Sequence, residues 1–286
     1  MKYAWIQAHR MAFCVEAMCR ILEVGKSGYY AWLKRPASGR QKRRNELLLK
    51  IKSVHTESRC VYGSPRVFHE LREQGVVVSE NTVAKLMSAA KISSKMVKRF
   101  VPKTTDSKHA FPVGENILDR QFEARAPNRK WVADITYIAT EEGWLFLAGV
   151  IDLYSRKVVG WSMAEHMKTG LVEDALKMAL ARRNPEKGLL HHSDRGTQYA
   201  CGDYQNVLAA HGLTCSMSRT GNCYDNAVME SFWSKLKTEL VYQEKYKTRD
   251  QARQSIFEYM EVFYNRRRRH SSLGYISPES FEAQMN

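Results

Sequence analysis

The feature that most constrains this sequence is a change of periodicity at Trp131. From there, three apolar segments with the composition of β-strands, WVADITYI, WLFLAGVID and KVVGWSM, are joined by short connections, which predicts an antiparallel meander. A helix over 169–183, a strand LLHHS, a helix over 203–211 and a short strand over 213–216 follow. The last element is a helix within 218–240, whose start Asn222 or Asp225 can cap. The predicted order is βββαβαβα, an α/β core.

Ahead of Trp131 the pattern is helical. Two short helices over 13–22 and 27–34 are separated by Gly25, with Ser27 as the expected N-cap, in the outline of a helix-turn-helix. A longer helix with one apolar side is expected over 41–58.

A second helix pair follows in the same region. One helix runs from Ser64 to Gln74 and stops at Gly75, and Ser79 caps another that runs through Ala90. The exposed start of this last helix presents Asn81 and Lys85, which we expect to contact DNA. A helix-turn-helix inserts its second helix in the major groove, although many such pairs bind nothing.

These patterns divide the chain into four parts. We expect a helix-turn-helix-like region over 1–60, a second such segment over 61–100, a basic linker over 101–128, and a catalytic core with a basic C-terminal tail over 129–286. The fold class is therefore an α/β (α+β) core preceded by an all-α region.

The net charge of +15 is unevenly distributed along the 286 residues. Residues 1–130 hold 26 Lys and Arg against 11 Asp and Glu, whereas residues 131–286 hold 19 of each. Clustered positive charge favours nucleic acid through counterion release, so the front half is predicted to bind a polyanion.

The six cysteines form no CxxC pair, which argues against a zinc knuckle or a disulfide framework. No apolar run or leader suggests a membrane protein, so a cytoplasmic, nucleoid-associated location is expected.

Three acids are candidates for one site. Asp134 lies within the first strand, Asp194 directly follows the fourth, and Glu230 lies on the last helix, with 35 residues between it and Asp194. If the first and fourth strands are neighbours, the three carboxylates converge. An all-oxygen set of this kind suits Mg²⁺ or Mn²⁺, and two such ions can hold the attacking and leaving oxygens of a phosphodiester.

Several blocks of the chain resemble a known family. The element order and the Asp, Asp, Glu set are similar to the ribonuclease H-like core of retroviral integrases and DDE transposases. HSDRGTQY, SMSRTGNCYDNAVMESFWSKLKTE and YNRRRRHSSLGYISPESFE resemble the catalytic (OrfB) product of the IS-three family of bacterial insertion sequences. The likeness extends through WVADITYI and YGSPRV and covers nearly the whole chain.

The resemblance implies a transposase that binds double-stranded element ends and target DNA and performs metal-dependent cleavage and 3′-hydroxyl strand transfer. It implies that Asp134, Asp194 and Glu230 hold the metal ions, that Lys237 orients a terminal phosphate, and that the chain assembles as a homo-oligomer on DNA. It also implies an upstream-frame (OrfA) product as fusion or partner.

Other conspicuous residues keep two interpretations. The run Arg266, Arg267, Arg268 and Arg269 is predicted to contact phosphates, although it could be a solvated helix end. Asp152 is expected to pair with Arg156 in a turn, with a smaller chance of reaching the site. His192 is more suited than His191 to face the site by alternation, although either could be structural.

Two other functions remain open at this stage. A nuclease of the same fold would hydrolyse DNA without joining it, and a repressor would bind DNA without catalysis. A repressor has no use for three converging carboxylates, which disfavours that function. An assay of strand joining would distinguish the nuclease from the transposase.

Overall fold

The computed structural model describes residues 1–36, 38–95, 112–220 and 222–284. The chain divides into two compact units, Met1–Ser53 and Val54–Asn286. Within the described ranges, no helix is both long and apolar enough to cross a membrane.

The first unit contains three short helices. They are α1 (Lys2–His9), α2 (Val15–Ile21) and α3 (Lys26–Lys34). Ile6, Met18, Cys19 and Tyr29 form its buried core, and the Tyr29 hydroxyl donates to Gln7 Oε1 at 2.7 Å. The two predicted helices are present. Helix α1 was not predicted, and Ser27 is not the N-cap, because α3 already begins at Lys26 and Gly25 takes the cap position.

The long helix α4 (Gly39–Glu57) leads into the second helix pair, α5 (Ser64–Glu73) and α6 (Glu80–Ala89). Helix α5 ends before Gly75, whose φ of 76° suits glycine. The Ser79 hydroxyl accepts the Thr82 N–H and caps α6, as the sequence predicts. Buried apolar side chains join the pair: Val67, Leu71, Val83, Leu86 and Met87.

The core is built on a five-stranded sheet in the order β3-β2-β1-β4-β5. Its strands are β1 (Lys130–Thr140), β2 (Gly143–Asp152), β3 (Val158–Ala164), β4 (Leu190–Ser193) and β5 (Thr214–Met217). Strands β1 to β3 form the predicted antiparallel meander, β4 runs parallel to β1, and β5 runs parallel to β4. The first and fourth strands are therefore neighbours, and the fold is ribonuclease H-like.

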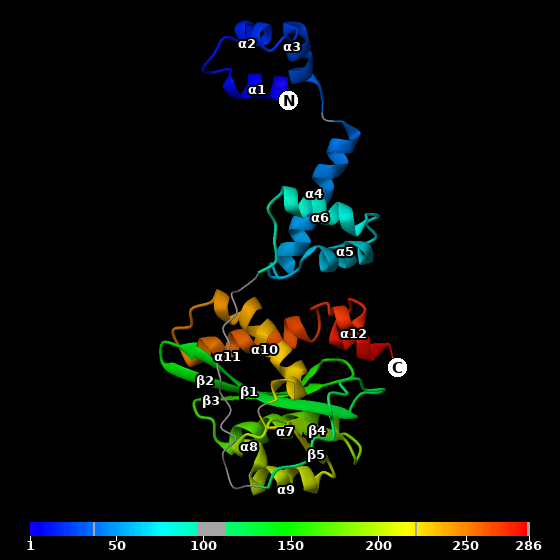
Figure 1. The fold of residues 1–286 in the computed structure, drawn as a ribbon, viewed down its shortest axis with the longest axis vertical. Coiled ribbons are helices and arrows are strands. Elements are labelled where there is room, and N and C mark those ends of the chain that lie inside the picture. Colours follow the sequence, from blue (N-terminus) through cyan, green and yellow to red (C-terminus); the bar gives the residue numbers. More distant parts are fainter. Residues whose placement is uncertain (37, 96–111, 221, 285–286) are drawn as a thin grey trace. The chain divides into compact units, whose positions relative to one another are not determined.

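Helices cover both faces of this sheet (Figure 1). One face carries α7 (Thr169–Arg183), α8 (Thr197–Ala200) and α9 (Gly202–Ala210), and the other carries α10 (Ala227–Glu239) and α11 (Arg249–Phe257). A π-helix (Glu258–Tyr264) and α12 (Pro278–Ala283) complete the C-terminal part. Trp131 and Ala133 of β1 belong to the core beneath α7 to α9. By strand alternation, the side chains of Val132 and Asp134 point to the opposite face, toward α10.

The connection between α6 and β1 is only partly described. Residues 112–129 contain neither helix nor strand. Residues 96–111, where much of the predicted basic linker falls, lie outside the described residues.

Candidate active site

The parallel pairing of β1 with β4 aligns two of the three acids. Trp131 pairs with His191 and Val132 with His192. Two residues beyond this last pair are Asp134, within β1, and Asp194, the first residue after β4, so the same register and alternation direct both toward one face. Asp194 Oδ1 accepts the Gly196 N–H at 2.9 Å.

The two aspartates are electrostatically coupled. Burial raises the pKa of Asp134 to about 8, and the negative charge of Asp194 adds to this increase. Hydrogen bonds from the Ile135 N–H and the Trp233 indole lower this pKa, and the charge of Glu230 raises it by a smaller amount. A carboxylate in this position is destabilised as an anion, and a cation beside it would relieve the cost.

Helix α10 brings Glu230 to the same region. The buried Asn226, its N-cap residue, donates from Nδ2 to the Ala133 carbonyl at 3.0 Å, which fixes the start of the helix beside β1. Three residues beyond Glu230, Trp233 Nε1 donates to Asp134 Oδ2 at 3.0 Å. Glu230 itself is exposed, and partial burial raises its pKa.

A buried carboxylate holds the loop before α10. Asp225 accepts three bonds from Arg219, at 2.8, 2.9 and 3.0 Å, and one each from Arg120 and Asn116. These bonds hold the pKa of Asp225 well below its usual range. Asp225 was one of two expected caps of the Glu230 helix. It serves the loop instead, and Asn222 caps the short 3₁₀ turn Cys223–Asn226.

The donor set fits a divalent cation. All three candidate ligands offer carboxylate oxygens, and Asn226 Oδ1 is buried nearby without a hydrogen-bond partner. In the described part of the chain, no three His, Cys, Asp or Glu side chains already lie close enough to hold an ion. Mutual repulsion of uncompensated carboxylates disfavours such an approach.

Comparison with known proteins decides the family. Residues 124–223 and 211–278 match two families that are both described as Integrase core domain, and residues 42–100 match an HTH-like domain. The transposase InsF of insertion sequence IS3A from Escherichia coli is 45% identical over 284 residues, which cover 99% of this chain and 98% of that protein. This chain belongs to the IS3 family of transposases. It is a DDE-type polynucleotidyl transferase of DNA transposition, it binds DNA, and its integrase core implies a divalent metal cofactor.

A second sequence relative and two solved integrase structures are also similar to this chain. The 31 kDa protein of insertion element IS600 from Shigella sonnei is 46% identical over 264 residues, 92% of this chain and 97% of that protein. The magnesium-bound catalytic core of HTLV-2 integrase covers 55% of this chain and 98% of its own, at 15% identity and a TM-score of 0.43. The BIV integrase core covers 55% and 95%, at 18% identity and a TM-score of 0.43. With scores this low, the family assignment depends on the sequence relatives.

Lys237 of the transposase lies on the flank of α10 that faces β1. Its ammonium lies 4.8 Å from the centre of the Tyr137 ring, a cation–π contact. Burial lowers the pKa of Lys237, and the charge of Asp134 raises it. The ammonium is therefore close enough to the predicted site to be influenced by it.

The arginine run divides into two kinds of residue. Arg268 is 1% exposed, with Nε and Nη2 at 2.8 and 2.5 Å from the carboxylate of Glu239. Arg269 is 8% exposed and pairs with Glu70 and Glu73 of α5. The prediction that Arg268 and Arg269 contact phosphates is wrong, because their guanidinium groups are buried and already paired with carboxylates. Arg266 and Arg267 are exposed, and for them the prediction stands.

His191, His192 and Asp152 have structural partners. His191 bonds the Tyr204 hydroxyl at 3.1 Å, and burial lowers its pKa to about 3. His192 is bonded to Ser216 and Ser218, and burial lowers its pKa to about 4.

Asp152 ends β2, three residues beyond the Gly149 that pairs with Asp134, and alternation directs its side chain to the opposite face of the sheet. Its carboxylate accepts from the Asn128 and Tyr154 N–H groups and pairs with Arg183 at 3.4 Å. The expected pairing with Arg156 is present only as a backbone bond, from the Arg156 N–H to the Asp152 carbonyl at 2.8 Å.

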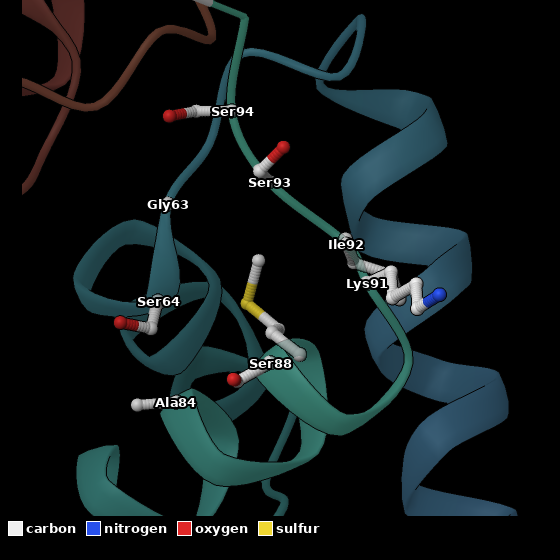
Figure 2. Close-up of a pocket in the computed structure, with 9 residues that line it drawn as sticks. Gly63, Ser64, Ala84, Ser88, Lys91, Ile92, Ser93 and Ser94 are labelled. Carbon is white, nitrogen blue, oxygen red and sulfur yellow. The ribbon is translucent and has the colours of Figure 1, made fainter.

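The helical region contains a separate hollow. It has a volume of about 540 Å³ and lies between the start of α5, the end of α6 and the segment that follows (Figure 2). Its lining contains no carboxylate, with Lys91 as its cation beside several serine hydroxyls. Asn81 and Lys85 on α6 are both exposed, as predicted, and neither lines it.

Trp233 and Asn226 were not predicted as partners of β1. Their positions, three residues after and four before Glu230, place them on the same flank of one helix, because seven residues make nearly two full turns. That spacing is the only signal the sequence contains, because their partners lie on a distant strand.

Proposed function

We propose that Asp134, Asp194 and Glu230 are the catalytic carboxylates of this transposase and that together they hold two Mg²⁺ or Mn²⁺ ions. The observation that carries the proposal is the alignment of Asp134 with Asp194 by the β1–β4 register, with α10 bonded to β1 on both sides of Glu230. Divalent cations bound there would activate the attacking oxygen and neutralise charge developing on the phosphate.

The reaction has two steps on phosphodiesters. In cleavage, water forms a bond to phosphorus at the element end, and the bond to the 3′ oxygen breaks and leaves a 3′-hydroxyl. In strand transfer, that 3′ oxygen gives up its proton and forms the new bond to a target phosphorus, and the bond from this phosphorus to the target's own 3′ oxygen breaks, so that the target strand leaves with a protonated 3′-hydroxyl. Rigid positioning of the carboxylates serves both steps, because bonds from β1 and the loop held by Asp225 restrict α10 before DNA arrives.

Lys237 is proposed to orient a terminal phosphate of the DNA. The Tyr137 ring contacts its ammonium, and the charge of Asp134 acts on its pKa. The Lys237 ammonium would bind an oxygen of this phosphate, and the three carboxylates would remain free to bind the metal ions.

Recognition of DNA is proposed to involve two surfaces. Asn81 and Lys85 on α6 would contact the major groove, and Arg266 and Arg267 would contact phosphates. The predicted division into 1–60, 61–100, 101–128 and 129–286 assigns the first two parts to element ends. The matched HTH-like domain at 42–100 supports the DNA-binding role of the helical region.

The wider assembly is also a proposal. We expect a homo-oligomer on paired element ends, with the OrfA product as fusion or partner, acting at the nucleoid in the cytoplasm.

The test uses the full chain, a labelled element end and Mg²⁺, with products sized for nicking and joining. The proposal expects both nicked and joined products. Nicks without joining would indicate a nuclease, and binding without either product would indicate a repressor.

A further inference from the structure

Trp233 makes the one side-chain bond to Asp134 that comes from α10. Its side chain is 5% exposed, and Nε1 lies 3.0 Å from Asp134 Oδ2. An indole N–H only donates and does not titrate at ordinary pH, so the carboxylate must accept. One oxygen of Asp134 is thereby occupied, and the orientation of the other is restricted.

The neighbouring strand is shaped around the same indole. Gly149 of β2 pairs directly with Asp134 across the sheet, so both lie on one face. A Cβ on Gly149 would lie 2.8 Å from Trp233 Cη2 and 3.3 Å from Cζ2. Real Cβ atoms do not approach that closely, so the benzo ring of Trp233 occupies the place of a side chain at 149.

Backbone conformation does not explain this glycine. Gly149 is absent from the described glycines with positive φ, and it lies between buried Ala148 and Val150 in a stretch that pairs regularly with β1. The register shift in the pairing with β3 comes after Val150, so Gly149 still pairs in register with Trp161. Strand interiors disfavour glycine. Glycine is needed at position 149 because any side chain there would occupy the space that the Trp233 indole fills when it bonds to Asp134.

We propose that Trp233 is a positioning residue for Asp134, and that Gly149 is the space that lets the indole reach it. The inference deepens the proposed function and depends on Asp134 being a metal ligand. Outer partners of this kind orient a ligand before the ion binds, and their loss typically costs about 10–100-fold in metal affinity or activity. Trp233 adds no charge and touches no substrate in this arrangement.

The decisive variant is Trp233→Phe in the full chain. It retains an aromatic ring in the core and removes only the N–H and the benzo extension. We expect Mn²⁺ affinity, measured by titration without DNA, to fall by about tenfold. Strand joining should then need correspondingly more Mg²⁺ and should recover when the metal is raised.

Trp161→Phe is the matched control. Trp161 also donates to a carboxylate, but to Glu261 Oε1 at 2.7 Å on the π-helix. It lies on β3, where it pairs with Gly149, and strand β2 separates it from Asp134. Loss of its bond to Glu261 should leave Mn²⁺ affinity unchanged. A general effect of removing an indole hydrogen bond from this part of the sheet would instead lower the Mn²⁺ affinity of both variants.

A second variant tests the steric part. Gly149→Ala should displace the indole and weaken Mn²⁺ binding even though Trp233 is intact. In Gly149→Ala/Trp233→Phe the smaller ring removes the clash, so the double variant should bind Mn²⁺ no more weakly than Trp233→Phe alone. This non-additivity is expected only if the two residues act through one contact.

The outcomes separate this inference from the proposed function. Asp134→Asn that still joins strands would refute the proposed site itself. If Asp134→Asn is inactive while folded Trp233→Phe and Gly149→Ala both bind Mn²⁺ like the wild type, the site stands and the positioning role is refuted. If Trp233→Phe does not fold, Gly149→Ala decides alone, with thermal melting as the check on folding.

Discussion

The sharpest prediction concerns Arg268, which lies in a run of four arginines and yet faces inward. In Arg268→Met, Glu239 loses the bonds at 2.8 and 2.5 Å and keeps the Tyr259 hydroxyl at 2.7 Å. The Glu239 side chain is 8% exposed, so water cannot replace the lost donors. Removal of one partner of a buried pair costs about 3–5 kcal/mol.

This cost gives a measurable shift. For a domain of this size class, roughly 2–4 °C of melting temperature are lost per kcal/mol, so Arg268→Met should melt roughly 6–20 °C lower. The assay is thermal unfolding of the full chain followed by circular dichroism. Arg268→Met/Glu239→Leu should recover part of the loss, because replacing both charges removes the unpaired carboxylate.

Arg267→Met is the neighbouring control. Arg267 is exposed, so its substitution should change the free energy of unfolding by less than about 0.5 kcal/mol. If Arg267 contacts a phosphate, the slope of log K against log[salt] for DNA binding should shrink by about 0.9. An Arg268→Met protein that melts like the wild type but has the reduced salt slope would refute the assignment of Arg268 to the core.

The remaining predictions concern the site and its supporting loop. Asp134→Asn, Asp194→Asn and Glu230→Gln should each abolish nicking and joining while DNA retention in gel shifts persists; normal turnover by any one of them removes that residue from the site. Lys237→Ala should weaken joining at limiting DNA more than it weakens Mn²⁺ binding, and an unchanged DNA dependence would make it an ordinary surface lysine. Because the pKa of Asp225 is depressed in the folded chain, its contribution to stability is present above about pH 4 and is lost as the pH falls. Urea unfolding of Asp225→Asn should therefore show a smaller drop in stability between pH 5 and pH 3 than the wild type, and an equal drop would contradict this role.

The sequence predicted those parts of the structure that depend on local periodicity. Strand alternation located Asp134, and the short apolar run before Asp194 predicted β4. The order of the elements permitted these two strands to be neighbours, and the structure pairs them. Helix boundaries set by Ser79 and Gly75 were predictable because capping and positive φ are local requirements.

The incorrect predictions, and the contacts that were not predicted, concern long-range partners. Arg268 resembles its exposed neighbours in sequence, and only Glu239, 29 residues away, makes it a core residue. Trp233 and Gly149 each look ordinary alone, since their relation exists only once α10 packs on the sheet. Asp225 was expected as a possible helix cap, but it binds Arg219 of its own loop and the distant Arg120, which makes it an anchor of the loop.

The pairing of Arg269 with α5 also bears on the order in which the chain can mature during synthesis. Arg269 Nε lies 2.7 Å from Glu70 Oε2 across 199 residues of sequence, and Tyr62 accepts the Arg269 N–H through its hydroxyl at 2.8 Å. Contacts of such separation form late, because the intervening chain must be made and ordered first. While a nascent chain has not yet reached residue 269, α5 and α6 have their own shared core but lack these partners. The ribosome must therefore complete the catalytic core before the helix pair within the matched HTH-like domain can pack against it.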